Sequence, residues 1–203
     1  MSTHNGQRRE RPGTYFVQDR SNQEEMTRLQ IQGQMFTAGM GGVLPEQPDP
    51  TGFRRILDVG CGTGDWLIQA AKTYPDMSRL VGIDISSSML DYARAQAAAQ
   101  QENHRVEFAV MDALLMLEFP SNSFDLVNQR LGMSYLRTWD WAKLLEEMQR
   151  VTKRNGVIRI TESNIIVENN SPALSRLYEF VLPAIYRAGH LFEEETTGLT
   201  AHL

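Results

Sequence analysis

Residues 55–64 read Arg-Ile-Leu-Asp-Val-Gly-Cys-Gly-Thr-Gly, a short apolar run that passes directly into glycines at alternate positions. A run of this length, bounded by turn residues, is typical of a buried strand. Gly60, Gly62 and Gly64 carry no Cβ, so the chain can turn tightly and a ligand can approach the backbone amides at the start of the next helix. The stretch therefore predicts a strand, a ligand-binding loop and a helix, in that order.

The rest of the chain continues this alternation, which is typical of a parallel sheet with crossover helices. We therefore predict an α/β fold with a Rossmann-like, doubly wound, mostly parallel sheet, preceded by a helix at 22–37. Asn155-Gly156 is expected to end helix 138–153 in a turn. The expected strands are 55–59, 79–84, 105–110, 124–128 and 156–162, and the later helices are 64–73, 87–101, 138–153 and 172–188.

Composition along the chain suggests four parts. Residues 1–14 are polar and basic, and they predict a disordered leader. Residues 15–50 predict an N-terminal helical cap and a linker rich in glycine and proline. Residues 51–165 hold the strands and helices of the core, and residues 166–203 predict a C-terminal helical segment.

The overall composition is that of an ordinary globular chain, with 41% hydrophobic and 22% charged residues in 203. The 20 Lys and Arg against 25 Asp and Glu give a net charge of −5, which argues against nucleic acid as a partner. Cys61 is the single cysteine, so no internal disulfide can form and a cytoplasmic location is the default expectation. No apolar run approaches the ~20 residues that a bilayer-spanning helix needs.

The glycine loop fits neither of the common phosphate-binding patterns. A dinucleotide fingerprint requires a third glycine at the spacing where Asp65 or Leu67 stands. A P-loop requires Lys and then Ser or Thr after its last glycine, but this chain has Asp65-Trp66 there. Asp58, at the entrance to the loop, disfavours a pyrophosphate and favours a cationic group on the ligand.

Polar residues stand at the ends of the next three expected strands. Asp84 is placed where a carboxylate can accept both hydroxyls of a ribose, and Asp112 where one can accept from the exocyclic amine of adenine. Asn128 closes the fourth strand. Ligands of open α/β sheets bind outside the carboxyl ends of the strands, so these side chains are expected to converge on one site.

With a glycine loop at 58–64 and acids after the next two strands, the sequence from about Arg54 to Glu162 resembles the class I S-adenosylmethionine-dependent methyltransferases. Residues 153–156, Lys-Arg-Asn-Gly, depart from that family's more usual Lys-Pro-Gly-Gly. The resemblance implies S-adenosyl-L-methionine as cofactor and S-adenosyl-L-homocysteine as product. The residues it places beside the cofactor are Tyr15, Asp58, Gly60, Cys61, Gly62, Thr63, Gly64, Asp84, Ile85, Met89, Met111, Asp112, Ala113 and Asn128.

Three roles follow from the resemblance: Asp58 faces the methionine amino group, Asp84 holds the ribose, and Asp112 with the Ala113 backbone addresses the adenine. The N-terminal helix is similar to that of small-molecule methyltransferases of secondary metabolism and quinone biosynthesis, in which it forms a lid. The family's sheet ends in an antiparallel hairpin. Few residues follow Glu162 here, so we expect a shortened C-terminal part, and a homodimer is one way to cover the open edge.

Methyl transfer from a sulfonium to O, N or C is an in-line displacement that needs alignment rather than a covalent nucleophile. We expect a small apolar or aromatic acceptor and no metal. His190 and Tyr135 are the candidates for a base or for positioning the acceptor, although His190 is also compatible with a structural role. Tyr178, Val181 and Ile185 also fit a core-facing stripe. The expected acceptor pocket contains Phe36, Met133, Tyr135, Trp139, Tyr178 and Tyr186.

Two alternatives use the same cofactor. The chain could be a regulatory or scaffold protein that binds the cofactor without turnover. It could also be an enzyme that uses the cofactor as an electrostatic aid in cyclisation or decarboxylation. A nicotinamide enzyme is a more remote reading, because the third glycine of the fingerprint is missing.

Overall fold

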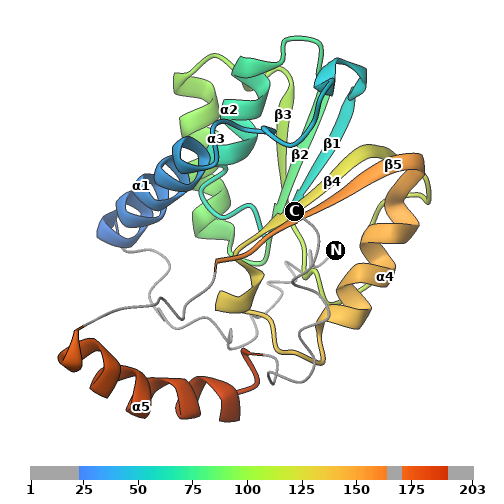
Figure 1. The fold of residues 1–203 in the computed structure, drawn as a ribbon. Helices are drawn as coiled ribbons and strands as arrows, with labels where there is room; N and C mark the ends of the chain where they lie inside the picture. The colour runs from blue at the N-terminus through green and yellow to red at the C-terminus, as the bar shows by residue number, and fades with distance from the viewer. Residues whose placement is uncertain (1–22, 164–170, 192–203) are drawn as a thin grey trace, which may run out of the picture.

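The computed structural model describes residues 23–163 and 171–191, and a five-stranded parallel sheet forms its centre. The strand order β3-β2-β1-β4-β5 puts the first strand in the middle, so the chain winds first toward one edge and then toward the other (Figure 1). The predicted doubly wound α/β fold is therefore confirmed. The strands are β1 (Arg55–Val59), β2 (Arg79–Asp84), β3 (Val106–Val110), β4 (Phe124–Arg130) and β5 (Thr152–Thr161).

Helices cover both faces of the sheet. In Figure 1, α1, α2 and α3 lie on one side and α4 on the other, whereas α5 lies apart from the sheet. No helix of the described residues has the length and apolar character needed to cross a membrane. The helices are α1 (Gln23–Gly39), α2 (Asp65–Thr73), α3 (Ser87–Ala99), α4 (Trp141–Val151) and α5 (Pro172–Arg187), with short 3-10 helices η1 (Pro50–Gly52) and η2 (Gly132–Ser134).

The central strands build two separate hydrophobic cores, because successive side chains of a strand point to opposite faces. Ile56 and Leu80 pack with the buried side chains of α2. Their neighbours Leu57 and Val81 pack with those of α4. Burial of both faces explains why the strands are almost continuously apolar.

Most predicted elements are found close to their expected bounds. The strands 55–59 and 79–84 match β1 and β2 residue for residue, and β4 runs two residues further than predicted, to Arg130. Helices α2, α3 and α5 are each one or two residues shorter than predicted, which is the usual uncertainty of helix ends.

The predicted boundary between helix 138–153 and strand 156–162 is wrong. The helix ends at Val151 and β5 begins at Thr152, whose hydroxyl donates to the carbonyl of Met148 at 2.6 Å. Asn155, expected in a turn, lies inside β5 with a φ of 64°. The register against β4 shifts there, so β5 contains a bulge that absorbs its extra residues. Asn155 and Gly156 favour a turn in sequence, but here they lie in the bulge of a strand that directly follows the helix.

α5 begins as predicted, with Ser171 accepting from the amide of Leu174 at 3.4 Å and proline at the first helical position. None of its residues is buried, and Phe180 is 76% exposed. The interpretation of Tyr178, Val181 and Ile185 as a core-facing stripe is therefore wrong for the described chain.

Several sequence-based expectations concern residues outside the described ranges. They are the leader at 1–14, Tyr15, and the residues from 192 onward that bear on a closing hairpin. The N-terminal helix of the predicted cap is α1, which packs beside α2. The predicted division into four parts stays a prediction.

Candidate functional site

The three glycines of the loop all have left-handed φ values between 54° and 72°. They nevertheless differ in their surroundings. A Cβ at Gly64 would lie 2.7 Å from the ring of Phe108, and one at Gly60 would overlap the Tyr135 hydroxyl. At Gly62 the nearest atom outside the loop is the sulfur of Met89, at 3.9 Å. Gly60 and Gly64 thus allow close packing, whereas a Cβ at Gly62 would make only an ordinary contact with Met89, so Gly62 is the least crowded of the three.

Asp84, at the end of β2, fixes the loop. One carboxylate oxygen accepts from the amide of Gly62 at 3.0 Å, and the other accepts from the amide of Ser86 at 2.9 Å. The amide of Cys61 donates to the carbonyl of Ile83 at 2.9 Å. Asp84 remains half-buried, so its carboxylate is accessible to further donors from a ligand such as ribose hydroxyls.

Asp58 lies at the end of β1 in a chain of buried polar contacts. The amide nitrogen of Asn128 donates to its carboxylate at 2.7 Å, and Arg159 donates to the Asn128 oxygen at 3.0 Å. Arg159 in turn pairs with Glu46 at 2.7 Å. Burial raises the pKa of Asp58 to about 6, although the Arg130 charge opposes this. Burial removes water from the Asp58 carboxylate and so disfavours its charged form. A cationic group on a ligand would stabilise that charged form, so the site favours such a group.

Arg130 is a site residue whose place the sequence did not reveal. Its guanidinium lies 5.7 Å from the centre of the Trp66 ring and donates to the Thr37 hydroxyl at 3.5 Å. Burial lowers the pKa of Arg130, and the Asp58 carboxylate raises it. Arg130 thus joins the end of β4 to α1. The signal that could have found it is its place two residues after Asn128 on the same strand.

The side of the site predicted for adenine lies at the end of β3. The amide of Met111 donates to the Asp84 carbonyl at 2.9 Å, which brings this end against β2. The Asp112 carboxylate accepts from the amide of Leu114 at 2.9 Å, so it also shapes its own turn. Asp112 and Ala113 are half-buried, as is Ile85 on the neighbouring strand end. The parallel sheet thus brings Asp58, Asp84, Asp112 and Asn128 to the carboxyl-terminal end of its strands, as predicted.

The remaining expected cofactor neighbours have inward-facing environments. Thr63 is 6% exposed within the loop, and Met89, at the start of α3, is 5% exposed. Burial raises the pKa of the Cys61 thiol well above its usual value, which disfavours the thiolate form. Among residues 23–163 and 171–191, no group of three His, Cys, Asp or Glu side chains is arranged to hold a metal ion.

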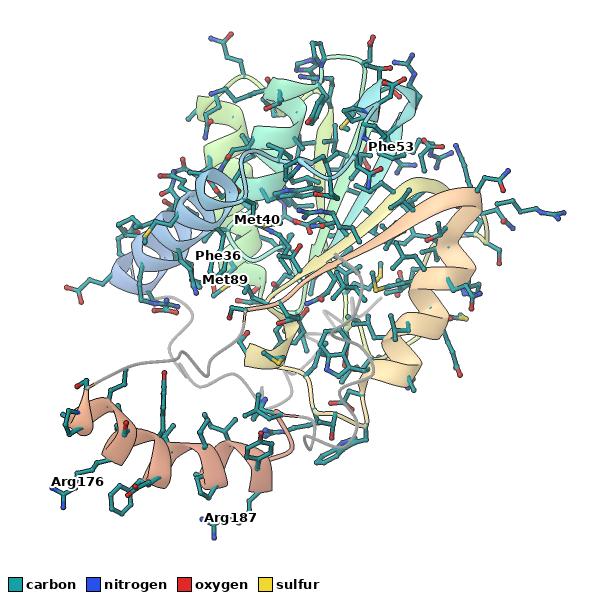
Figure 2. All side chains as sticks on the ribbon, viewed as in Figure 1. Phe36, Met40, Phe53, Met89, Arg176 and Arg187 are labelled. Carbon is teal, nitrogen blue, oxygen red and sulfur yellow. The ribbon has the colours of Figure 1, made fainter. Side chains whose placement is uncertain are left out.

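One of the expected acceptor-side residues, Tyr135, lies directly beside the glycine loop. Tyr135 packs over Gly60, and burial raises the pKa of its phenol above the usual value. Met133, two residues earlier, is half-buried against the core on the α4 side. Phe36, on α1, lies toward the same end of the sheet as Met89 (Figure 2).

The other expected acceptor-side residues are not gathered at the loop. Trp139 is 67% exposed and its ring lies against Gly189, where a Cβ would be 2.5 Å from it. Tyr178 and Tyr186 lie on α5, which is apart from the sheet (Figure 1). His190 is 3% exposed, and its Nδ1 lies 2.8 Å from the carbonyl of Met133.

Glu162 is a second residue that sequence reasoning missed. It follows β5, and its carboxylate accepts from the amides of Gly132 and Met133 at 2.6 and 3.3 Å. Burial raises its pKa. No local pattern marks it, because its partners lie about 30 residues earlier in the chain.

The profile of a family described as "Methyltransferase domain" matches residues 56–156, the span that holds the glycine loop and all three strand-end acids. Through this domain the chain belongs to the class I S-adenosylmethionine-dependent methyltransferases. The methyltransferase domain also explains why both phosphate-binding patterns fail at the loop.

Relatives of known name support this assignment. A demethylmenaquinone methyltransferase of Staphylococcus aureus is 32% identical over 133 residues, which are 64% of this chain and 52% of the relative. This chain therefore spans about half the length of the curated relatives it matches.

Solved structures are similar as well. Phosphoethanolamine N-methyltransferase 2 of Haemonchus contortus, in complex with S-adenosyl-L-methionine, has 27% identity and a TM-score of 0.57 over 76% of this chain and 33% of that one. An O-methyltransferase family protein from Burkholderia thailandensis has 22% identity and a TM-score of 0.61 over 85% of this chain and 49% of that one, which supports the fold alone.

Proposed function

We propose that this protein transfers a methyl group from S-adenosyl-L-methionine to O, N or C of a small apolar or aromatic metabolite. The observation that carries the proposal is that the carboxyl ends of the parallel strands bring Asp58, Asp84 and Asp112 to the same end of the sheet as the glycine loop, where Asp84 accepts from the Gly62 amide.

The residues present fit a ligand that carries an amino-acid group and an adenosine. Buried Asp58 is suited to the ammonium, and the Arg130 guanidinium near it is suited to the carboxylate. Asp84 and Asp112 are both half-buried carboxylates, as needed to accept from ribose hydroxyls and from an adenine amine. Gly62 is the least crowded glycine of the loop, since only Met89 approaches it.

When bound, S-adenosyl-L-methionine supplies a methyl group on a positively charged sulfur. The chain itself supplies alignment, which can contribute ~7 to 11 kcal/mol to a well-oriented displacement. Asp84 holds the glycine loop at the Gly62 amide and Tyr135 packs over Gly60, so both residues fix the position of the loop to which the cofactor would bind. Because burial keeps the Tyr135 phenol protonated, this residue is suited to donate a hydrogen bond rather than to act as a base.

An apolar aromatic acceptor is favoured by the side chains expected on the acceptor side. Phe36, Met133 and Tyr135 offer aromatic and thioether surface, which suits a flat ring. The Staphylococcus aureus relative is named for a quinone precursor. We therefore propose a phenol or hydroquinone as the acceptor class.

Calorimetry and mass spectrometry test the proposal together. Titration with S-adenosyl-L-homocysteine should show binding, and Asp84→Ala should weaken it by about 1 to 3 kcal/mol, the cost of losing hydrogen bonds to a charged group. Asp91→Ala is the matched control, because Asp91 is a largely exposed acid in α3 that pairs with Arg94. Absence of binding in the wild type would overturn the proposal.

Methyl transfer is then assayed with a panel of phenols and hydroquinones, and the product should gain the mass of one methylene. Binding without transfer to any acceptor would favour a regulatory or scaffold protein. A product of altered structure without that gain would favour a cyclase or decarboxylase.

A further inference from the structure

The chain turns sharply where it leaves β4. The amide of Leu131 donates to the carbonyl of Thr161 at 2.8 Å, which is the last contact between β4 and β5. Leu131 then adopts a left-handed φ of 57°, a conformation that is unfavourable for a residue with a Cβ. The amides of Gly132 and Met133 would lack partners inside a one-turn helix, and both donate to the Glu162 carboxylate. Glu162, directly after β5, therefore caps η2 from a distant part of the sequence.

His190 holds the same segment from the other side. Its Nδ1 lies 2.8 Å from the carbonyl of Met133 and 3.0 Å from that of Leu136. Both partners are acceptors, so Nδ1 must carry the hydrogen and donate it. The Met133 backbone is thus held at its N–H by Glu162 and at its carbonyl by His190.

The segment 131–136 is closely packed, so it has little room to change its conformation. A Cβ at Gly132 would overlap the side-chain amide of Gln129 and lie 2.8 Å from Leu136. At the end of the segment, the Tyr135 hydroxyl fills the space above Gly60. A shift of the segment would therefore move Tyr135 relative to the cofactor loop.

We infer that Glu162 and His190 are positioning residues that hold segment 131–136 from its two sides and thereby set the acceptor-side residue Tyr135 against the glycine loop. This inference rests on the proposed function and deepens it. His190 thus acts through a hydrogen bond to the backbone, in place of removing a proton from the acceptor. The 3% exposure of His190 agrees with this role.

Two substitutions of His190 separate positioning from base catalysis. An asparagine side chain can place an N–H near the position of Nδ1 but cannot take up a proton. We expect kcat of His190→Asn to stay within about threefold of the wild type, whereas His190→Ala should raise the acceptor KM about tenfold and leave the cofactor KM within about twofold. A loss of about a hundredfold or more in kcat for His190→Asn, with a normal acceptor KM, would overturn positioning in favour of a base.

Glu162 is tested by hydrogen exchange, which requires neither cofactor nor acceptor. In Glu162→Ala the amides of Gly132 and Met133 should exchange about tenfold faster than in the wild type, as expected when a hydrogen bond to a carboxylate is lost. Glu162→Gln keeps one acceptor oxygen and should lie between the two. Glu107→Ala, which removes an exposed glutamate on the opposite edge strand, is the control and should leave these amides unchanged.

The two readouts keep the inference separate from the proposed function. Unchanged exchange at Gly132 and Met133 in Glu162→Ala would overturn the inference even if the wild type methylates an acceptor. Faster exchange in a protein that binds no S-adenosyl-L-homocysteine would support the holding contact and refute the proposed function.

Discussion

The candidate site lies at the carboxyl ends of the five strands, and its two halves are built in different ways. On the half formed by β1, β2 and β3, neighbouring strand ends hold one another: Asp84 accepts from the Gly62 amide, and its carbonyl accepts from Met111. On the half formed by β4 and β5, the segment after β4 depends on side chains from far along the sequence. Glu162 lies 30 residues from its partner Gly132, and His190 lies 57 residues from Met133.

This difference has a consequence for evolution of specificity. The first half depends on the left-handed backbone of the glycine loop and on contacts between neighbouring strand ends, so substitutions there are expected to weaken cofactor binding. The second half depends on replaceable side-chain contacts, so the acceptor pocket can change while the cofactor site persists. Substitutions in each half should therefore differ in effect, and the opposite end of the sheet, where the strands begin, serves as a reference.

Gly64→Ala should give the largest effect. The substitution forces a residue with a Cβ into a φ of 72° and places that Cβ 2.7 Å from the Phe108 ring and 3.0 Å from Ala93. We expect the free energy of unfolding, measured with urea, to fall by about 2 to 3 kcal/mol from left-handed strain and overpacking.

Gly39→Ala is the matched control, because no atom lies within 4 Å of the added Cβ at the end of α1. It should change stability by less than ~0.5 kcal/mol. If both variants had equal stability, the packing role of Gly64 would be wrong.

The same contrast explains what could be predicted from sequence. The glycine loop and the acids at the ends of β2 and β3 follow one another locally, so strand ends, loop and converging carboxylates were all predicted from residues 55–112. Glu162 was not assigned, because its contacts arise only when β4 and β5 pair in the observed register. The sequence offered Arg130 only as a residue that could attract an acidic acceptor, because its contacts with Thr37 and Trp66 form only when α1 and α2 pack beside β4. His190 was identified as a candidate, but its hydrogen bonds to backbone carbonyls could not be read from the sequence.

The boundary between α4 and β5 was mispredicted for a related physical reason. Asn155 and Gly156 favour turns, but the pairing of β5 with β4 keeps them within a bulged strand. Tertiary pairing thus overrode local turn preference. The exposed face of α5 could not be foreseen either, since an apolar stripe at helical spacing does not reveal what it packs against.

Asp125→Ala should give the next largest effect. Asp125 lies at the start of β4, at the end of the sheet opposite the candidate site. Asp125 accepts from the amides of Arg54 and Arg55 at 2.9 and 2.7 Å and pairs with Lys153 at 2.6 Å. We expect a loss of about 2 kcal/mol in unfolding free energy with unchanged cofactor affinity. Asp76→Ala is the control, since Asp76 forms only an exposed ion pair, and should leave stability nearly unchanged.

The Asp125 effect should also depend on pH. Burial alone would raise the pKa of Asp125, but Lys153 and the two amides together hold it below its usual value. Its stabilisation is therefore present above the ordinary pKa of about 3.8 and is lost as the pH falls through the lower folded value. The difference between wild type and Asp125→Ala, measured by thermal unfolding, should shrink below about pH 4. A constant difference would exclude the ionised carboxylate as its cause.

For Asp58, the property that we expect to depend on pH is the affinity for the ligand. Burial raises its pKa to about 6, so a cationic ligand must bind the fraction of molecules in which Asp58 is ionised. Between about pH 7 and pH 5, affinity for S-adenosyl-L-homocysteine measured by calorimetry should fall by up to about tenfold. Asp58→Asn should bind more weakly at neutral pH and show no such fall. A parallel decline in both proteins would assign the titration to another group.

Trp139→Ala should give the smallest effect and tests how far the acceptor pocket extends. Trp139 is 67% exposed and its ring lies against Gly189, next to His190. We expect stability to change by less than ~1 kcal/mol and the acceptor KM by less than about twofold. Tyr135→Phe removes only the hydroxyl above Gly60 and should raise that KM more. If Trp139→Ala had the larger effect, the acceptor would bind along the side of the chain that carries α5, and the half formed by β4 and β5 would extend beyond segment 131–136.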